Sequence, residues 1–441
     1  MSFLSRRQAE RLLAGLMQND RVDEIHAVLR STDGTVFRIA ENLPDAPHRT
    51  SDSSLQITVR VGRRYGSART NDLSEEGLNA LVERAARHAS VMPESPRVFP
   101  FPGADASAQP AADDSAQMRI PSAEVIRGVI GQSTGADMRI SGSIAATRSS
   151  ISVATSNGLL LHHPSDRIHT RFRVYASNGQ STGFGEHFSS SLDTSRIERT
   201  VQTAIDKCAA WRNPVEIDPT RITTVFEPRA LADLFAPFIQ QFSQRAIEED
   251  GSFLRKLDGS SFVGSKMFKE TVTLRSDPAA QGLLSLPFTL DGIPVKPETW
   301  IRNGVIEQVA VDRYTADERG IEPVAPPTNL MMDGGEQTLD ELIAGTSRGL
   351  LVSGFADLRM IDPKNCLLSG STRDGLFMIE DGTITGAVRN LMIRETPVYM
   401  LKELEDAGIP EHTSTTGTYV PMLLPPLRVK DALYGASSGL I

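Results

Sequence analysis

Two short segments of the sequence have the spacing of a serine-hydrolase nucleophile motif. Residues 131–135 and 179–183 both read Gly-x-Ser-x-Gly, with Ser133 and Ser181 at their centres. This pattern supports catalysis only where the serine lies on a strained turn between a buried strand and a helix. Ser133 follows a helix-like stretch and Ser181 follows a turn at Asn178, and two copies of one short pattern suggest chance. Serine catalysis therefore stays an alternative interpretation.

Histidines that could bind a metal gather in the same half of the chain. They are His162, His163, His169 and His187, the last preceded by Glu186. A zinc site needs three or four converging ligands. Adjacent residues of a strand, such as His162 and His163, point to opposite faces. We therefore expect histidines of a surface or hairpin and no metal site here.

A few other side chains could be reactive. The cysteines are Cys208 and Cys366, and a buried or half-buried thiol is the simpler interpretation of Cys366. Glu248, Glu249 and Asp250 could act in acid–base chemistry. At the end of a predicted helix, such a run is more often solvated, although the helix dipole disfavours negative charge there.

Length and composition limit the class of protein that positions these residues. The chain has 441 residues, of which 39% are hydrophobic and 23% charged, with a formal net charge of −9. This length favours two domains. The charge balance argues against nucleic-acid binding, which needs a concentrated basic face. We find neither a signal peptide nor an apolar stretch near the ~20 residues of a membrane span, and expect a cytoplasmic protein.

Hydrophobic periodicity predicts an α+β fold, with a mixed α/β domain over residues 1–213 and a strand-rich, mostly antiparallel domain over residues 214–441. The first domain should begin with a helix over 5–19, a hairpin over 25–39 that turns at Asp33-Gly34, and a strand pair near 55–61. A helix that starts at Asp72, with a capping glutamate at Glu75, should follow. After an exposed connection over 93–122, we expect a hairpin over 151–161 and a helix over 194–211. In the second we expect a helix over 229–249, hairpins turning at Asn303-Gly304 and Asp381-Gly382, and a helix over 338–349 capped by Thr338 and Glu341.

An ordered series of short motifs resembles the TldD/PmbA family. No single motif is specific, but together they run in the family's order from about residue 70 to 390. The motifs are Thr70–Ser74, Ala154–Gly158, Asp250 followed by Gly259–Gly264, Asp291–Pro294, Asn303-Gly304, Thr328–Leu330, Gly349–Val352 and Ile379–Gly382.

The resemblance implies where a zinc site would lie. Zinc-carrying members have H-E-x-x-x-H on the helix that precedes the motif matched here by Asp250 and Gly259–Gly264. A later cysteine is a further ligand of their zinc. In this chain those positions fall on Gln240, Gln241, Arg245 and Thr413, with His412 beside the last. An amide is a poor zinc ligand, a guanidinium repels the ion, and Gln241 cannot act as a base at neutral pH.

The chain is therefore identified as similar to the family's metal-free PmbA/TldE-like branch. That branch implies a non-catalytic subunit, without a metal or other cofactor of its own, in a heterodimeric metallopeptidase that cleaves unfolded or precursor peptides. The zinc is expected in a TldD-like partner. A homodimer that holds an extended peptide at a sheet edge without catalysis, and the serine hydrolase, remain the alternatives. Nucleic-acid and membrane partners are not expected.

Overall fold

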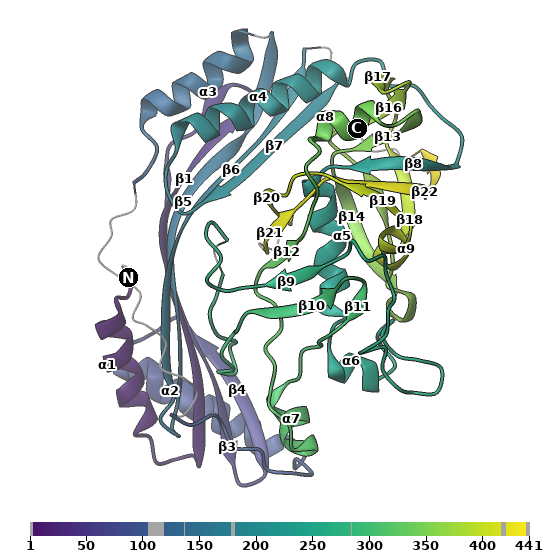
Figure 1. Cartoon of the computed structure of the whole chain (residues 1–441). Helices are drawn as coiled ribbons and strands as arrows, with labels where there is room; N and C mark the ends of the chain where they lie inside the picture. The colour runs from purple at the N-terminus through teal and green to yellow at the C-terminus, as the bar shows by residue number, and fades with distance from the viewer. Residues whose placement is uncertain are drawn as a thin grey trace.

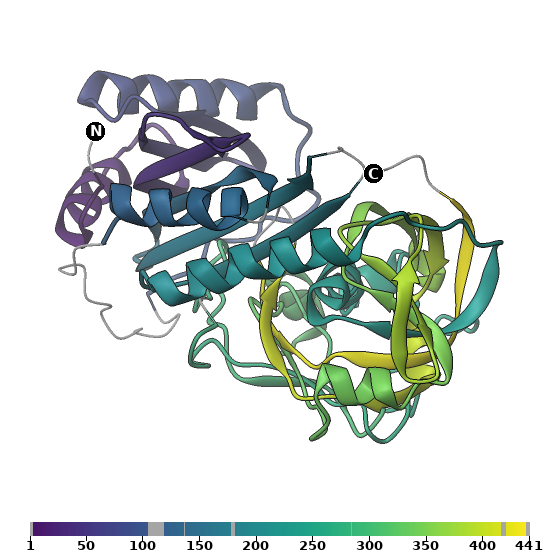
Figure 2. The same ribbon diagram turned by 90° about the horizontal axis from the view of Figure 1, so that it is seen from above.

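The computed structural model describes residues 3–104, 119–135, 137–177, 181–283, 285–415 and 420–437. One long curved sheet carries helices on its outer side, and a second body of sheets and shorter helices lies against its inner side (Figures 1 and 2). Helices and mostly antiparallel sheets confirm the predicted α+β class.

The long sheet has the strand order β4-β3-β1-β5-β6-β7, with β2 paired to β1, and every pairing in it is antiparallel. Its strands are β1 (Glu24–Ala40), β2 (Leu43–Pro44), β3 (His48–Val61), β4 (Arg64–Thr70), β5 (Met138–Thr155), β6 (Leu160–Ala176) and β7 (Thr182–Ser189). The strand pair expected near 55–61 and the hairpin over 151–161 are present as β3–β4 and β5–β6.

Strand β1 runs through Gly34 without turning, so the hairpin predicted over residues 25–39 is wrong. A Cβ atom at Gly34 would lie 2.6 Å from the carbonyl oxygen of Ala146 on β5. This glycine therefore allows close approach of the neighbouring strand. The chain turns instead at Glu41 and Asn42, whose φ angles are 48° and 69°.

Helices cover the outer face of this sheet (Figure 1). The hydrophobic cluster under the first two helices includes Ile25, Ala27 and Leu29 from the start of β1. The cluster under the third and fourth helices includes Phe37 and Ile39 from the end of β1. All five residues have odd numbers and share one face of the strand. The helices are α1 (Arg6–Met17), α2 (Glu75–Val91), α3 (Ala123–Gly135) and α4 (Thr194–Ala210).

The helices predicted over 5–19 and 194–211 are confirmed as α1 and α4, but the start of α2 needs a correction. The N-cap of α2 is Ser74, whose side chain accepts a hydrogen bond from the backbone N–H of Gly77. Asp72 instead accepts from the backbone N–H of Ser74, at 3.0 Å. The aspartate thus orders the turn before the cap.

Two further sheets form the second body. One has the order β11-β10-β9-β12-β21-β20, and the other β14-β15-β18-β22-β8-β13-β16-β17 with β19 beside β22. Only the β12–β21 and β8–β13 pairings among the described strands are parallel, which confirms a mostly antiparallel arrangement. The strands are β8 (Thr220–Phe226), β9 (Leu274–Ser276), β10 (Glu298–Arg302), β11 (Val305–Ile306), β12 (Leu330–Met332), β13 (Arg348–Val352), β14 (Phe355–Asp362), β15 (Leu367–Thr372), β16 (Leu376–Glu380), β17 (Thr383–Ala387), β18 (Leu391–Glu395), β19 (Leu404–Ala407), β20 (Glu411–Ser414), β21 (Pro421–Leu424) and β22 (Leu427–Ser437).

The two predicted tight turns of this body are confirmed. Asn303 and Gly304 join β10 to β11 with φ angles of 49° and 80°, and Asp381 and Gly382 join β16 to β17 with φ angles of 48° and 75°. Positive φ at both central residues is the requirement of the turn that suits right-twisted strands.

Short helices complete the second body: α5 (Pro228–Gln240), α6 (Gln244–Glu248), α7 (Arg313–Arg319), α8 (Leu339–Ala344), the 3₁₀ turn η1 (Pro363–Asn365) and α9 (Pro397–Lys402). The capping box of Thr338 and Glu341 at the start of α8 is confirmed. The helix predicted to reach residue 349 ends at Ala344, because β13 begins at Arg348.

Helix α5 forms the centre of the largest hydrophobic cluster. Leu234, Phe235 and Phe238 are fully buried, and the cluster includes Trp300 from one sheet and Tyr434 from the other. A helix that is apolar on nearly all sides is stable only when enclosed. The end of α5 is thus held firmly between the two sheets.

The connection predicted over residues 93–122 lies partly outside the described residues, which stop at 104 and resume at 119. Its described part is exposed over residues 93–94 and 96–98, and the residues after these contact both bodies. The backbone N–H of Phe101 donates to Glu24 at 3.0 Å, and the guanidinium of Arg313 lies 4.8 Å from the ring centre of Phe99. A domain boundary near residue 213 stays a prediction. No helix within the described ranges is long and apolar enough to cross a membrane.

Candidate functional site

The helix predicted over residues 229–249 is two helices, α5 and α6, and the prediction of one continuous helix is wrong. The carbonyl of Phe242 accepts a hydrogen bond from the backbone N–H of Ala310 at 2.8 Å, and the N–H of Gln244 donates to the carbonyl of Ala310 at 2.9 Å. These bonds pair residues 242–244 with another segment as a strand would. The helical hydrogen-bond pattern therefore stops at this point.

The break separates the positions that the resemblance assigns to metal ligands. Gln240 is the last residue of α5 and is exposed, and Gln241 follows as the C-cap residue. Arg245 lies on α6, where its Nε donates to Glu249 at 2.8 Å and 67% of its side chain is exposed. Arg245 is thus engaged in a surface ion pair on a separate helix.

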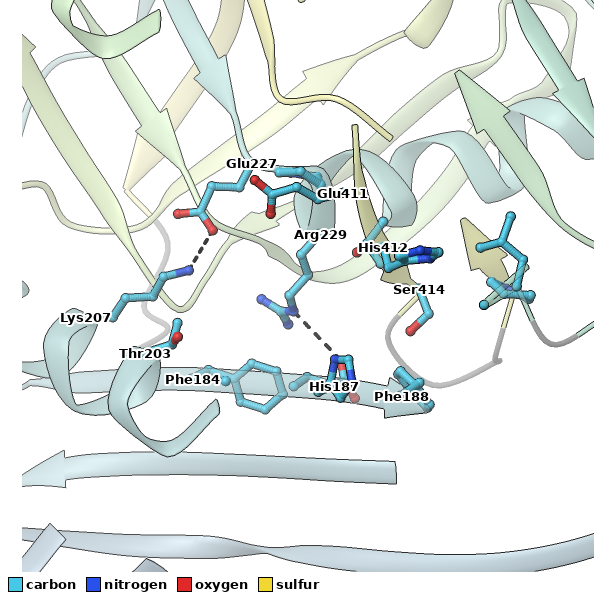
Figure 3. A pocket seen from close by; sticks show the side chains of 17 residues that line it. Phe184, His187, Phe188, Thr203, Lys207, Glu227, Arg229, Glu411, His412 and Ser414 are labelled. Carbon is cyan, nitrogen blue, oxygen red and sulfur yellow. Dashed lines mark hydrogen bonds and ion pairs between the residues drawn. The ribbon is translucent and has the colours of Figure 1, made fainter. Parts of the chain in front are cut away.

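Thr413, the fourth assigned position, lies on the edge strand β20. It lines a cavity of about 200 Å³ bounded by β20, β7 and α4 (Figure 3). Gln240 does not line this cavity; it lines two larger ones, of about 570 and 360 Å³. Gln240 and Thr413 therefore line neighbouring cavities, whereas Gln241 and Arg245 line none of these three.

Carboxylates, a lysine and histidines line the smallest of these, the β7–β20 cavity. Lys207 Nζ donates to one oxygen of Glu227 at 2.7 Å, and Ser353 Oγ donates to the other at 2.6 Å (Figure 3 shows the lysine). Burial and the nearby charge of Glu227 raise the pKa of Glu411. The carboxylate of Glu227 therefore has a hydrogen bond to each oxygen, whereas that of Glu411 is more readily protonated than an ordinary glutamate.

Two imidazoles of the β7–β20 cavity are held neutral. Burial, assisted by the positive charge of Arg196, lowers the pKa of His187 to about 4. Burial also lowers the pKa of His412. The Nε2 atom of His187 is buried and has no hydrogen-bond partner in the described part of the chain. Neutral imidazoles could bind a metal, but these are only two.

The cavity of about 570 Å³, called here the arginine cavity, shares Phe184, Glu186 and Arg229 with the β7–β20 cavity. Arginines from three elements line it: Arg171 and Arg173 on β6, Arg229 on α5, and Arg373 after β15. The alternation of β6 places Arg171 and Arg173 on the inner face, because Phe172 between them is buried under the outer helices.

Buried carboxylates hold two of these arginines. The Asp374 carboxylate, 2% exposed, lies 2.7 Å from Arg173 Nη1 and 3.3 Å from Arg229 Nη2. Glu186, 5% exposed, is hydrogen bonded to His169 Nε2 at 2.8 Å and lies 3.9 Å from Arg229 Nε. This network connects β6 and β7 of the long sheet to α5 and to the loop after β15.

The third cavity, of about 360 Å³, is lined mainly by apolar groups. Ile239, Phe242, Ile293 and Val324 contribute to its wall, together with Gln240. Because Gln240 also lines the arginine cavity, its amide lies between a charged space and an apolar one. An amide both donates and accepts hydrogen bonds, so it can bind a peptide backbone.

The side chains at the four assigned positions do not fit a zinc ion. Zinc prefers imidazole, thiolate and carboxylate, whereas Gln240 and Gln241 offer amides and Thr413 a hydroxyl. Arg245 carries a fixed positive charge. Elsewhere, no three or more His, Cys, Asp or Glu side chains of the described residues form a group that could hold a metal.

Two family models match the chain. Residues 219–435 match the PmbA/TldA metallopeptidase C-terminal domain, and residues 27–89 match the PmbA/TldA metallopeptidase domain 1. The chain belongs to the PmbA/TldD family. The resemblance predicted from short motifs is thereby confirmed.

Curated relatives of this PmbA/TldD protein are distant. A protein named metalloprotease from Methanothermobacter thermautotrophicus is 23% identical over 282 residues, which span 59% of this chain and 60% of that relative. The match therefore covers less than two thirds of that relative's length. A metalloprotease PmbA homolog of Haemophilus influenzae is 24% identical over 84% of each chain, and the metalloprotease PmbA of Escherichia coli O157:H7 is 21% identical over 86% of each.

Solved structures share the fold. TldE from Thermococcus kodakarensis superposes with a TM-score of 0.81 at 17% identity, over 97% of this chain and 99% of TldE. A protein from Bacteroides thetaiotaomicron, described as a modulator of DNA gyrase, superposes with a TM-score of 0.82 at 17% identity, over 98% and 99%. At this identity the likeness concerns the fold alone.

The two predicted serines of this PmbA/TldD chain lie in structural positions. Ser133 is buried within α3, where its Oγ donates to Asn42 at 2.9 Å and to the carbonyl of Ile130 at 3.0 Å. Ser181 is buried directly before β7, and its carbonyl accepts the thiol of Cys208. Neither lies on the strand-to-helix turn that a hydrolase nucleophile needs, and residues 178–180 of the second motif are outside the described part.

The histidines predicted not to form a metal site are dispersed. His162 is hydrogen bonded to Ser152 at 2.8 Å, whereas burial lowers the pKa of its neighbour His163, which lines a different cavity. His169 stacks on Phe188, with ring centres 4.0 Å apart, and contacts Glu186. Only His187 of this group lines the β7–β20 cavity.

The cysteine and the acidic run have the environments expected of them. Cys366 is fully buried, and burial raises the pKa of its thiol to about 12, so it is a poor nucleophile. The carboxylates of Glu248, Glu249 and Asp250 are exposed, and each is paired with a cation. Their partners are, in the same order, Arg319, Arg245 and Lys364.

Sequence reasoning missed the arginine network. Arg171 and Arg173 alternate with buried residues in a strand, and this pattern could have indicated a charged inner face. Asp374 and Arg229 are far from them in the sequence, so no local spacing predicts that they meet.

Proposed function

We propose that this PmbA/TldD chain is a metal-free, non-catalytic subunit of a heterodimeric TldD/TldE-like metallopeptidase in the cytoplasm. Its partner is a zinc-bearing homologue, which supplies the metal and the general base. The complex cleaves unfolded or precursor peptides, and this chain encloses part of the peptide in the cavities around α5.

One observation carries the proposal: the side chains at the four assigned positions cannot perform zinc-dependent hydrolysis. Gln240 and Thr413 offer weak donors, and Gln241 has no basic group that could take a proton from water. Arg245 repels a cation and is bound to Glu249. Acquiring peptidase activity therefore requires a second chain.

The relatives supply a peptidase context for this proposal. The Haemophilus influenzae and Escherichia coli proteins are named metalloproteases, and the Thermococcus kodakarensis structure is named TldE. Cavities that present charged, apolar and amide groups in succession suit an extended peptide better than a compact metabolite.

Reconstitution tests the proposal. The chain alone, a homologue with H-E-x-x-x-H alone, and both together are incubated with an unfolded protein, and fragments are followed by mass spectrometry. We expect cleavage only by the mixture and its loss on addition of a chelator. Size-exclusion chromatography should show the two chains eluting together.

The matched control replaces the glutamate of the homologue's H-E-x-x-x-H by glutamine while this chain stays unchanged. That mixture should form the complex without cleaving. Zinc-dependent cleavage by this chain alone would overturn the proposal, and failure to associate with the homologue would favour the homodimeric alternative.

A further inference from the structure

We propose that the arginine cavity binds a carboxylate of the peptide, either its C-terminal group or an acidic side chain. This inference rests on the proposed function and names the class of peptide that the chain would hold. The partners are guanidinium groups that the internal network leaves with donors to spare.

The first argument is that three guanidinium groups surround one buried carboxylate. The single carboxylate of Asp374 is shared by Arg173, Arg229 and Arg373, the last at 3.9 Å. Nε of Arg373 is buried, has no hydrogen-bond partner within the described residues and lies 3.9 Å from the Asp374 carboxylate. An additional carboxylate would supply an acceptor for Arg373, and charge-assisted bonds of this kind are the strong ones.

The second argument is the position of Arg171. It lies two residues before Arg173 on the same inner face of β6 and is exposed. Its side chain has no hydrogen-bond or ion-pair partner among the residues that the structure describes. A guanidinium presents a planar pair of donors that matches a carboxylate. Arg171 can therefore contact a ligand without breaking an internal ion pair.

The acidic groups of the cavity do not cancel this preference. Glu186 is engaged by His169 and faces Arg229. Asp233 lies one helical turn after Arg229 on α5, at the spacing of an intrahelical ion pair. Asp357 is exposed, where water screens its charge. Arg171 and Arg373 are thus left as the cations for a ligand.

The third argument concerns what lies beside the carboxylate. Gln240 lines both the arginine cavity and the apolar cavity of Ile239, Phe242 and Ile293. A peptide that crosses Gln240 can place a carboxylate in the arginine cavity and an apolar side chain in the apolar cavity. The side-chain amide of Gln240 can then form hydrogen bonds with the peptide backbone. The preferred ligand is therefore an extended peptide with a carboxylate next to an apolar residue.

Fluorescence anisotropy of the full chain with three labelled pentapeptides tests this inference. One peptide ends in leucine with a free carboxylate, the second is its C-terminal amide, and the third is the amide with glutamate before the leucine. We expect the first or the third to bind at least about tenfold more tightly than the neutral amide. Which of the two does so identifies the source of the carboxylate.

Variants assign the effect to the cavity. Arg171→Gln and Arg373→Gln should each reduce the preference for a carboxylate severalfold, and Arg171→Gln is at an exposed position that folding tolerates. Gln240→Ala should weaken all three peptides alike, because it removes a backbone contact. The control Arg394→Gln replaces an exposed arginine of β18 that does not line the cavity, and it should retain the full preference.

Equal affinity for the three peptides, absence of binding, or a preference that survives both Arg171→Gln and Arg373→Gln would refute the inference. None of these results concerns zinc or cleavage. They leave the proposed subunit role standing, whereas zinc-dependent cleavage by this chain alone rejects that role whatever the peptides do.

Discussion

At the end of α5, single side chains determine which chemistry the cleft can support. Gln240 and Gln241 provide hydrogen bonds without basicity, and Arg245 provides a positive charge that is bound to Glu249 at the surface. In the β7–β20 cavity, by contrast, partial desolvation lowers the pKa values of His187 and His412 and favours their neutral forms. The assigned positions therefore carry no good zinc ligand and no general base, and Thr413 is the one of the four that lines the cavity of these imidazoles.

The half-buried imidazole of His187 makes the stability of the chain depend on pH. Its pKa is about 4 in the folded chain and near 6.5 when unfolded, so the unfolded chain binds the extra proton first as the pH falls. The contribution of the neutral imidazole to the free energy of unfolding is fully present above pH 6.5 and is lost progressively as the pH falls toward 4. Between pH 7.5 and 5, the free energy of unfolding should fall by about 1 kcal/mol less in His187→Gln than in the unaltered chain, as measured with urea. This value is discounted for the partial exposure of the side chain.

The unaltered chain and His187→Gln are unfolded in parallel under the same conditions at each pH. The same dependence in His187→Gln would show that this imidazole is not held neutral by the fold.

At the scale of elements, the sequence predicted what local chemistry determines. The capping box of Thr338 and the Asn303-Gly304 turn were predictable because each depends on residues within a few positions. The run of β1 through Gly34 depends on β5, and the end of α5 depends on Ala310, both distant in sequence. The locations of Gln240 and Thr413 near the cavities followed only from the family resemblance.

Gly183, at the end of the second serine-like motif, illustrates an element-scale requirement. A Cβ atom at Gly183 on β7 would overlap the carbonyl oxygen of Ala204 and the backbone nitrogen of Cys208 on α4. Gly183→Ala should therefore lower the free energy of unfolding by about 1–3 kcal/mol, because α4 must move away from the sheet. Thermal and urea unfolding measure this change.

Gly131 in the first motif is the matched control. A Cβ atom there meets nothing within 4 Å, so Gly131→Ala within α3 should be neutral or stabilise the chain by about 0.5–1 kcal/mol. If Gly183→Ala is as harmless as Gly131→Ala, the close packing of α4 on β7 is wrong.

At the scale of the whole molecule, the network of Asp374 joins the long sheet to the second body. Arg173 belongs to β6, Arg229 to α5, and Asp374 to the loop after β15, so one carboxylate connects three elements. Such a network positions α5, and with it Gln240, against the inner face of the sheet. These contacts could not be predicted from sequence, because they require the complete fold.

Removing this carboxylate should be costly. Asp374→Asn leaves the largely buried guanidinium groups of Arg173 and Arg229 without their negative counter-charge, which typically costs about 3–5 kcal/mol. Asp333→Asn is the control, since Asp333 is 48% exposed and pairs with Arg275 at the surface; it should cost less than about 1 kcal/mol. Equal losses in urea unfolding would contradict a buried linking role for Asp374.

The metal content of the purified chain tests the central claim most directly. Elemental analysis is performed on the chain alone and on its complex with the zinc-bearing homologue, after dialysis against zinc-containing and then zinc-free buffer. The account predicts no retained zinc in the chain alone, and zinc in the complex in proportion to the homologue only. One zinc ion retained per copy of this chain, and lost when Gln240 or Thr413 is replaced by alanine, would contradict it.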